Sequence, residues 1–134
     1  MIFHIAVCSP DAGLRSGLER QCMEFFARRA DACIVEHLPD TDALLRKDGE
    51  GVRYDLYLLE LSGSAAPVGL AAAGELRRRG RRAPLAFVAR TTAHKAGFTV
   101  LGVQDAASAD DAPAMAQVCD QFLPDWTALD WTTI

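Results

Sequence analysis

The sequence predicts an α/β fold in which helices cover both faces of a doubly wound parallel sheet. Short apolar runs alternate with segments whose apolar residues recur at helical spacing, a pattern typical of repeated βα units. The run at residues 55–61 is apolar almost throughout, as expected for a central strand covered on both faces. We therefore predict five βα units in one domain over residues 1–123. A tail or linker over residues 124–134 holds both tryptophans of the chain.

The first βα unit carries a strong signal for the start of a helix. A strand over residues 2–7 leads into Ser9 and Pro10. Serine as an N-cap, followed by proline in the first turn, is favoured at helix starts. The predicted helix runs to about residue 28 and buries one apolar stripe, formed by Leu14, Leu18, Cys22 and Phe25.

The second unit is shorter. Residues 32–38 form a mixed apolar and polar strand, which suits the edge of a sheet. Asp40 or Thr41 then caps a short helix, and the glycine-containing stretch 47–51 reads as a loop. We expect this unit to lie beside the first strand.

The third unit follows the central strand at 55–61. An alanine-rich helix is predicted up to about Arg79, and Gly80 supplies the left-handed conformation that ends many helices. Apolar residues 84–89 then form the fourth strand.

The last third of the chain gives weaker patterns. Thr91 or Thr92 is expected to cap a helix that continues through Val100. A weak fifth strand is predicted at 103–107, and a final helix at about 112–122. These elements complete the five predicted units.

Composition argues against several functional classes. The chain has 134 residues and a net charge of −4, which gives no general attraction to nucleic acid or to anionic membranes. We see neither a signal peptide nor an apolar run long enough for a membrane span, so we expect a soluble, cytoplasmic protein. The chain has four cysteines, and their spacing is not that of metal ligands: Cys8, Cys22, Cys33 and Cys119. We expect reduced thiols, no metal and no cofactor.

Three stretches of this sequence resemble the receiver domains of bacterial response regulators, most closely those that precede LytTR-type DNA-binding domains. The stretches are Ile5-Ala6-Val7-Cys8, Tyr54-Asp55-Leu56-Tyr57-Leu58-Leu59-Glu60 and Leu85-Ala86-Phe87-Val88. The resemblance implies a flavodoxin-like (βα)5 fold with strand order 2-1-3-4-5. It also implies that a DNA-binding output domain could follow the chain.

The same resemblance makes Glu60 the equivalent of the phospho-acceptor aspartate. Phosphoryl transfer to such an aspartate requires Mg²⁺ and countercharges. Asp11 is a poor substitute for a Mg²⁺-binding acid, because it is expected inside the first helix. In this sequence Ser9 and Pro10 stand where the family has its Mg²⁺-binding acids, and Ala89 stands where it has the switch hydroxyl. Ala106 replaces the switch aromatic, and Ala109 replaces the lysine that pairs with the phosphate. We therefore expect a degenerate receiver that is neither phosphorylated nor an enzyme.

Two interpretations of Glu60 remain open: a carboxylate at a solvated strand end, which is favoured, or an imitation of the phosphorylated aspartate. In either case we expect an interaction module of signal transduction or transcriptional regulation. By analogy with the family, a protein partner or a second copy would bind the face made by the fourth helix, fifth strand and fifth helix. The alternative is a small-ligand-binding or enzymatic domain that uses the crevice near Cys8, Ser9 and Glu60.

Two further features each allow two interpretations. The arginines of residues 77–82 could form a solvated helix end or a patch that binds phosphate or nucleic acid. We favour the solvated helix end, because cations there stabilise the helix dipole. This cluster should lie at the end of the sheet opposite Glu60. Trp126 and Trp131 either anchor an interface or pack back onto the domain itself.

Overall fold

The computed structural model describes residues 2–28, 30–61, 65–90 and 98–104. In this part of the chain, five strands form one sheet in the order β2-β1-β3-β4-β5, and the first four are parallel. The protein is therefore α/β with strand order 2-1-3-4 in its parallel part, consistent with a flavodoxin-like fold. The elements are β1 (Ile2–Cys8), α1 (Ala12–Arg28), β2 (Ala32–Leu38), α2 (Thr41–Gly49), β3 (Leu56–Glu60), α3 (Ala65–Arg78), β4 (Leu85–Arg90) and β5 (Phe98–Gln104).

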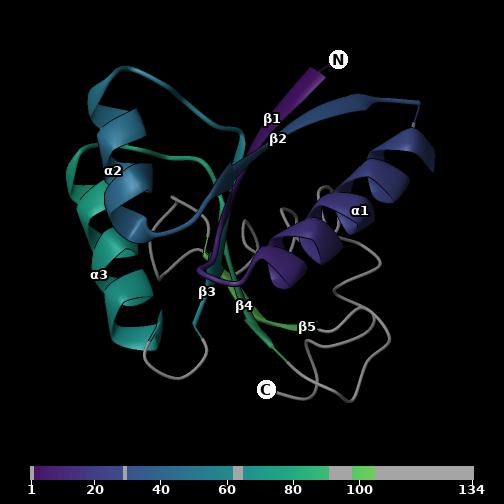
Figure 1. Ribbon diagram of the computed structural model, residues 1–134. Coiled ribbons are helices and arrows are strands. Elements are labelled where there is room, and N and C mark those ends of the chain that lie inside the picture. Colours follow the sequence, from purple (N-terminus) through teal and green to yellow (C-terminus); the bar gives the residue numbers. More distant parts are fainter. Residues whose placement is uncertain (1, 29, 62–64, 91–97, 105–134) are drawn as a thin grey trace.

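The described helices cover opposite faces of the sheet. Figure 1 shows α1 on one face and α2 with α3 on the other. Alternate residues of β1 point to opposite faces, so Ile5 and Val7 join the α1 core, whereas Ala6 and Cys8 join the core under α2 and α3. All five residues of β3 are buried, as predicted for a central strand.

The three helices end in the same hydrogen-bond pattern. Two positions after the last residue of each described helix, the backbone has a positive φ: Ala30 (58°), Gly51 (93°) and Gly80 (87°). After α3, for example, the Gly80 amide donates to Arg77 and the Arg81 amide to Leu76, the paired bonds of a Schellman motif. The prediction that Gly80 ends α3 is confirmed.

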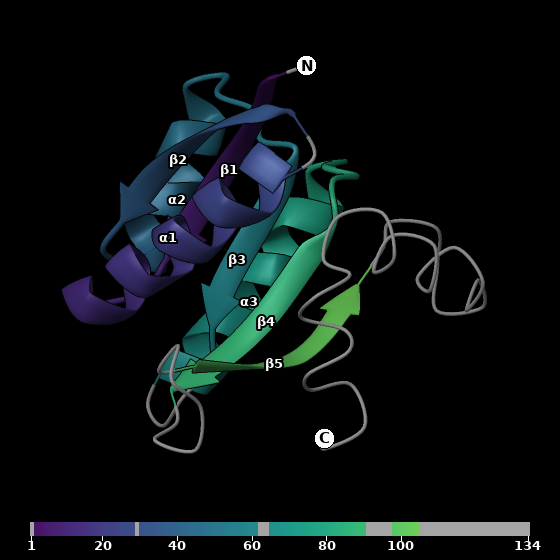
Figure 2. The ribbon, with the colours of Figure 1, turned by 90° about the vertical axis from the view of Figure 1, so that its right-hand side faces the viewer.

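The fifth strand differs from the prediction in position and direction. A helix was expected through Val100, but residues 98–104 form β5, which runs antiparallel to β4. Only residues 91–97 join the two strands, whereas a crossover between parallel strands needs about a dozen or more. Figure 2 shows β5 at the sheet edge beyond β4, with β2 at the opposite edge.

Several predictions concern residues outside the described ranges. They include the start of the fourth helix, the end of the strand expected at 103–107, the helix at 112–122 and the tail at 124–134. Ala106, Ala109, Trp126 and Trp131 also lie outside the described residues.

Candidate functional site

The carboxyl ends of three parallel strands bring the predicted site residues together. Cys8 ends β1 and Ser9 follows it, while Glu60 ends β3 and Arg90 ends β4. Cys8 pairs in register with Leu59, and Glu60 pairs with Val88. This is the crevice where ligands of open α/β sheets bind, and the sequence placed Ser9 and Glu60 in it.

Glu60 is buried, with only 3 % of its surface exposed. The Ser9 hydroxyl donates a hydrogen bond of 2.5 Å to Glu60 Oε1, and Arg90 Nε lies 3.1 Å from Glu60 Oε2 in an ion pair. The favoured expectation of a carboxylate at a solvated strand end is therefore wrong. Arg90 supplies the positive charge that makes burial of this carboxylate tolerable.

Arg90 also connects Glu60 to Asp11. Arg90 Nη1 lies 3.1 Å from Asp11 Oδ2, while Asp11 Oδ1 accepts a hydrogen bond of 2.9 Å from the Leu14 amide. The bond from Leu14, followed by that from Arg90, lowers the pKa of Asp11, although partial desolvation opposes the shift. Asp11 is thus held ionised by the first turn of α1 and by the strand end of β4.

The start of α1 differs from the prediction in register. The helix begins at Ala12, so Asp11 precedes it rather than lying inside it, and Asp11 instead of Ser9 caps the first turn. The Ser9 hydroxyl accepts from the Asp11 amide at 3.0 Å and donates to Glu60. Helix capping alone therefore does not explain Ser9, because its hydroxyl joins the turn to the buried carboxylate.

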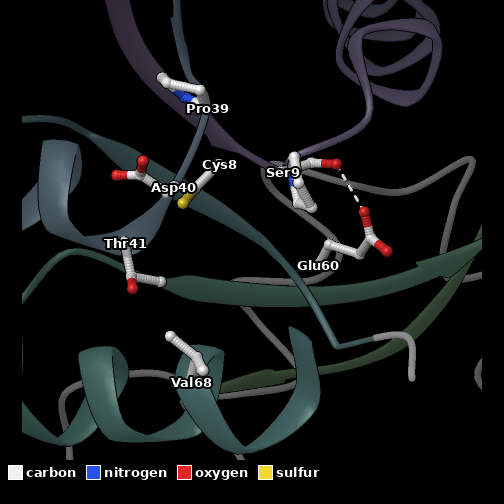
Figure 3. Close-up of a pocket in the computed structure, with 8 residues that line it drawn as sticks. Cys8, Ser9, Pro39, Asp40, Thr41, Glu60 and Val68 are labelled. Carbon is white, nitrogen blue, oxygen red and sulfur yellow. Dashed lines mark hydrogen bonds between the residues drawn. The ribbon is translucent and has the colours of Figure 1, made fainter. Parts of the chain in front are cut away.

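A pocket of about 220 Å³ opens beside this cluster. Figure 3 shows the Cys8 thiol on its inner side, with Thr41 of α2 and Val68 of α3 facing one another, and the Glu60 carboxylate turned toward Ser9. The remaining lining residues are Pro10, Pro39 and Asp40. Gly69 lets α3 approach this strand end closely, since a Cβ there would lie 3.0 Å from the Glu60 carbonyl oxygen.

Two groups on the pocket wall, Cys8 and Asp40, have structural roles in the fold. Burial, with a smaller contribution from Asp40, raises the pKa of the Cys8 thiol to about 12, so this thiol is protonated at neutral pH. The Asp40 side chain accepts from the Ala43 amide and thereby caps α2, one of the two alternatives that the sequence left open. Cys8 is core filler in this geometry, as its sequence context indicated.

Sequence reasoning missed Arg90. The fourth strand was expected to end at Ala89, but β4 continues through Arg90, and Ala89 is a partly buried strand residue without a hydroxyl. The available signal was the arginine directly after Ala89, because a buried Glu60 requires a charged partner. Pro10 is exposed at the pocket and offers no oxygen side chain for a metal.

The arginines of residues 77–82 lie at the other end of the sheet and serve a buried carboxylate there. Asp48 of α2 is 3 % exposed and contacts three arginines: Arg81 at 2.6 Å, Arg79 at 3.2 Å and Arg53 at 3.4 Å. Burial acts to raise the pKa of Asp48, but the hydrogen bonds from Arg81 and Arg79 outweigh it and lower the pKa. This cluster joins the C-terminal ends of α2 and α3, so it is more than a solvated helix end.

No protein-family model matches this chain, and no curated protein matches it as a relative. Among the described residues, no group of three or more His, Cys, Asp or Glu side chains is arranged to hold a metal ion. Within the same residues, none of the helices combines the length and apolar character that crossing a membrane requires.

Proposed function

We propose that this chain is a receiver-like interaction module of signal transduction or transcriptional regulation that works in the cytoplasm without being phosphorylated. The observation that carries the proposal is that Glu60 is satisfied internally, by an ion pair with Arg90 and a hydrogen bond from Ser9. A phosphoryl acceptor must present an oxygen in line with the incoming phosphorus. Glu60 is buried and its two oxygens face Ser9 and Arg90.

The charge balance around Glu60 supports the same proposal. Mg²⁺ binds through one or two carboxylates and keeps several waters in near-octahedral geometry. The second carboxylate of the crevice, Asp11, caps α1 and pairs with Arg90. A guanidinium thus stands between the two acids, and a divalent cation entering there would meet its repulsion.

In this proposal the module displays a constant surface to a protein partner or a second copy. The face around the fifth strand and an attached DNA-binding output domain belong to the proposal by analogy with the family. Within the described part, that face contributes β5, whose antiparallel direction differs from the family pattern. A partner surface built on it would therefore be particular to this chain.

The test is incubation with Mg²⁺ and a small phosphodonor, followed by intact-mass measurement. We expect no phosphoryl adduct. The Glu60→Gln variant is the matched control, because it keeps the shape of the side chain but removes its charge. An adduct on the wild type that disappears in this variant would refute the proposal and identify Glu60 as a live acceptor.

The pocket supports a second candidate function, the binding of a small ligand. Its volume of about 220 Å³ is below the range of drug-sized pockets, which begins at about 300 Å³, so a ligand would be small. A thermal-shift screen with nucleotides, flavins and metal ions tests this candidate, because a ligand that binds only the native state raises the melting temperature. A saturable shift that Thr41→Leu abolishes would favour ligand binding over the interaction module.

A further inference from the structure

The strongest concentration of positive charge lies at the C-terminal ends of α2 and α3. Residues 46–53 and 75–82 contain eight Lys and Arg residues but three Asp and Glu residues. Arg79 donates to the Leu45 carbonyl at 3.0 Å and contacts Asp48 at 3.2 Å, so the two stretches meet in one place. This end of the molecule is positive although the whole chain carries a net charge of −4.

Part of this charge is used within the fold, and part faces solvent. Arg53, Arg79 and Arg81 form ion pairs with the buried Asp48, as described above. Arg46 and Arg82 are exposed, and the Arg78 side chain is 77 % exposed while it pairs with Glu75. We call Arg46, Arg78 and Arg82 the basic surface.

The direction of β5 brings the chain back to this surface. Gln104, the last residue of β5, pairs with Leu85, the first residue of β4. Leu85 follows Arg81 and Arg82 closely in the sequence, so β5 ends at Gln104 on the side of the sheet where these arginines precede β4. A parallel fifth strand would have delivered the chain to the opposite end, next to Glu60.

The sequence beyond β5 is complementary in charge. Residues 105–134 contain six aspartates and no Lys, Arg or His, so residues 1–104 carry a formal net charge of +2. Two of the aspartates precede the two tryptophans, in Asp125-Trp126 and Asp130-Trp131. Carboxylates pair with guanidinium groups, and tryptophan is the best aromatic partner for a cation.

We propose that the acidic segment 105–134 docks on the basic surface of its own chain. The two are joined directly at Gln104, and a short tether gives an effective concentration in the millimolar range. Weak individual ion pairs therefore suffice to keep the segment bound at low ionic strength. This inference is independent of the proposed function.

Tryptophan fluorescence tests the proposal in the full chain, because both tryptophans belong to the segment. We expect acrylamide quenching to be weak at low salt and to rise about twofold near 1 M NaCl, where the screening length falls to about 3 Å. The variant Arg78→Glu with Arg82→Glu should be quenched this strongly already at low salt. The matched control, Arg20→Glu with Arg28→Glu on α1, makes the same change in net charge and should behave as the wild type.

Three results would overturn the inference. Strong quenching of the wild type at low salt would mean that the segment is not docked. Weak quenching that stays weak in high salt and in the charge-reversed Arg78 and Arg82 variant would mean that the tryptophans are buried on an apolar surface elsewhere. Light scattering could show a dimer mass for the wild type and a monomer mass for the variant Arg78→Glu with Arg82→Glu. The basic surface would then bind the acidic segment of a second copy. Circular dichroism of the variants checks that each one is folded.

Discussion

Arg90 decides the chemistry of the position that Glu60 occupies. The resemblance to receivers singled out Glu60 and Ser9 and set Asp11 aside as a poor substitute, whereas the structure brings all three together. The resemblance did not predict Arg90, because family signatures describe the residues that an active site needs. A cation that neutralises a buried acid has no counterpart among them. The physical signal for Arg90 was that a buried carboxylate such as Glu60 requires a positive charge nearby.

The Glu60–Arg90 pair is expected to contribute to stability. Arg90→Ala leaves the buried carboxylate without its cation and should lower the free energy of unfolding by about 1–3 kcal/mol. This loss is smaller than for a fully buried ion pair, because the Arg90 side chain is 51 % exposed. In the variant, water can fill the space that the side chain leaves. Urea unfolding measures the change. Adding Glu60→Gln should restore much of the loss, whereas Arg82→Ala, at an exposed position, should change stability by less than about 0.5 kcal/mol.

Asp48 should make the stability depend on acid pH. Its folded-state pKa is lowered, so its contribution is present above the unfolded value of 3.8 and is lost as the pH falls through the folded value. Asp48→Asn should cost about 2–3 kcal/mol at pH 7, because three arginines lose their buried counterion. Urea unfolding at a series of pH values should show this cost shrinking below pH 3.8. A cost that stays constant down to pH 2 would contradict the assignment.

At the scale of elements, local signals predicted the first four strands and three helices well. Their apolar periods agree with the burial that tertiary packing requires, as at β3, where all five residues are buried. The last element failed for a topological reason. Residues 91–97 are too short for a helical crossover, so β5 pairs antiparallel and takes up residues 98–100, which had been assigned to a helix. No local pattern distinguishes the two directions of pairing.

The C-terminal ends of the helices give a matched pair of substitutions. Ala30 and Gly80 occupy equivalent positive-φ positions after α1 and α3, and this conformation disfavours residues that carry a Cβ. Ala30→Gly should therefore raise the free energy of unfolding by about 0.5–1 kcal/mol, because relief of strain outweighs the added unfolded-state entropy. Gly80→Ala should lower it by about 1 kcal/mol, and a Cβ at Gly80 would meet no atom within 4 Å, so no clash contributes. Thermal and urea unfolding should rank the variants in this order; a destabilised Ala30→Gly protein would disprove the strain at α1.

At the scale of the whole molecule, the two ends of the sheet carry different clusters of charge. Arg90 pairs with both Glu60 and Asp11 at the carboxyl ends of the strands. Asp48 and its arginines join α2 to α3 at the other end. Each cluster ties separate elements together by charge, and the first one lies in the crevice where ligands of open α/β sheets bind. From this arrangement we predict one dominant conformation rather than a two-state switch.

We therefore expect no response to the usual activating ligands of receivers. Titration with Mg²⁺ and beryllofluoride should leave the amide chemical shifts around Glu60 and Ala89 unchanged. Relaxation dispersion should detect no exchange between two global states in the described strands and helices. Saturable shifts at these residues, or a minor state that the additions enrich, would show that the switch is intact.

The antiparallel pairing of β4 and β5 also bears on how the chain folds. It is the one described strand pair joined by a connection as short as seven residues, 91–97, whereas β1, β2, β3 and β4 must meet across whole helices. Contacts between residues close in sequence form faster than those that require the closure of long loops. We expect the β4–β5 ladder to gain protection in pulse-labelling hydrogen exchange before the β1–β3 ladder does. The strand that departs from the repeating pattern would then be the first part of the sheet to assemble.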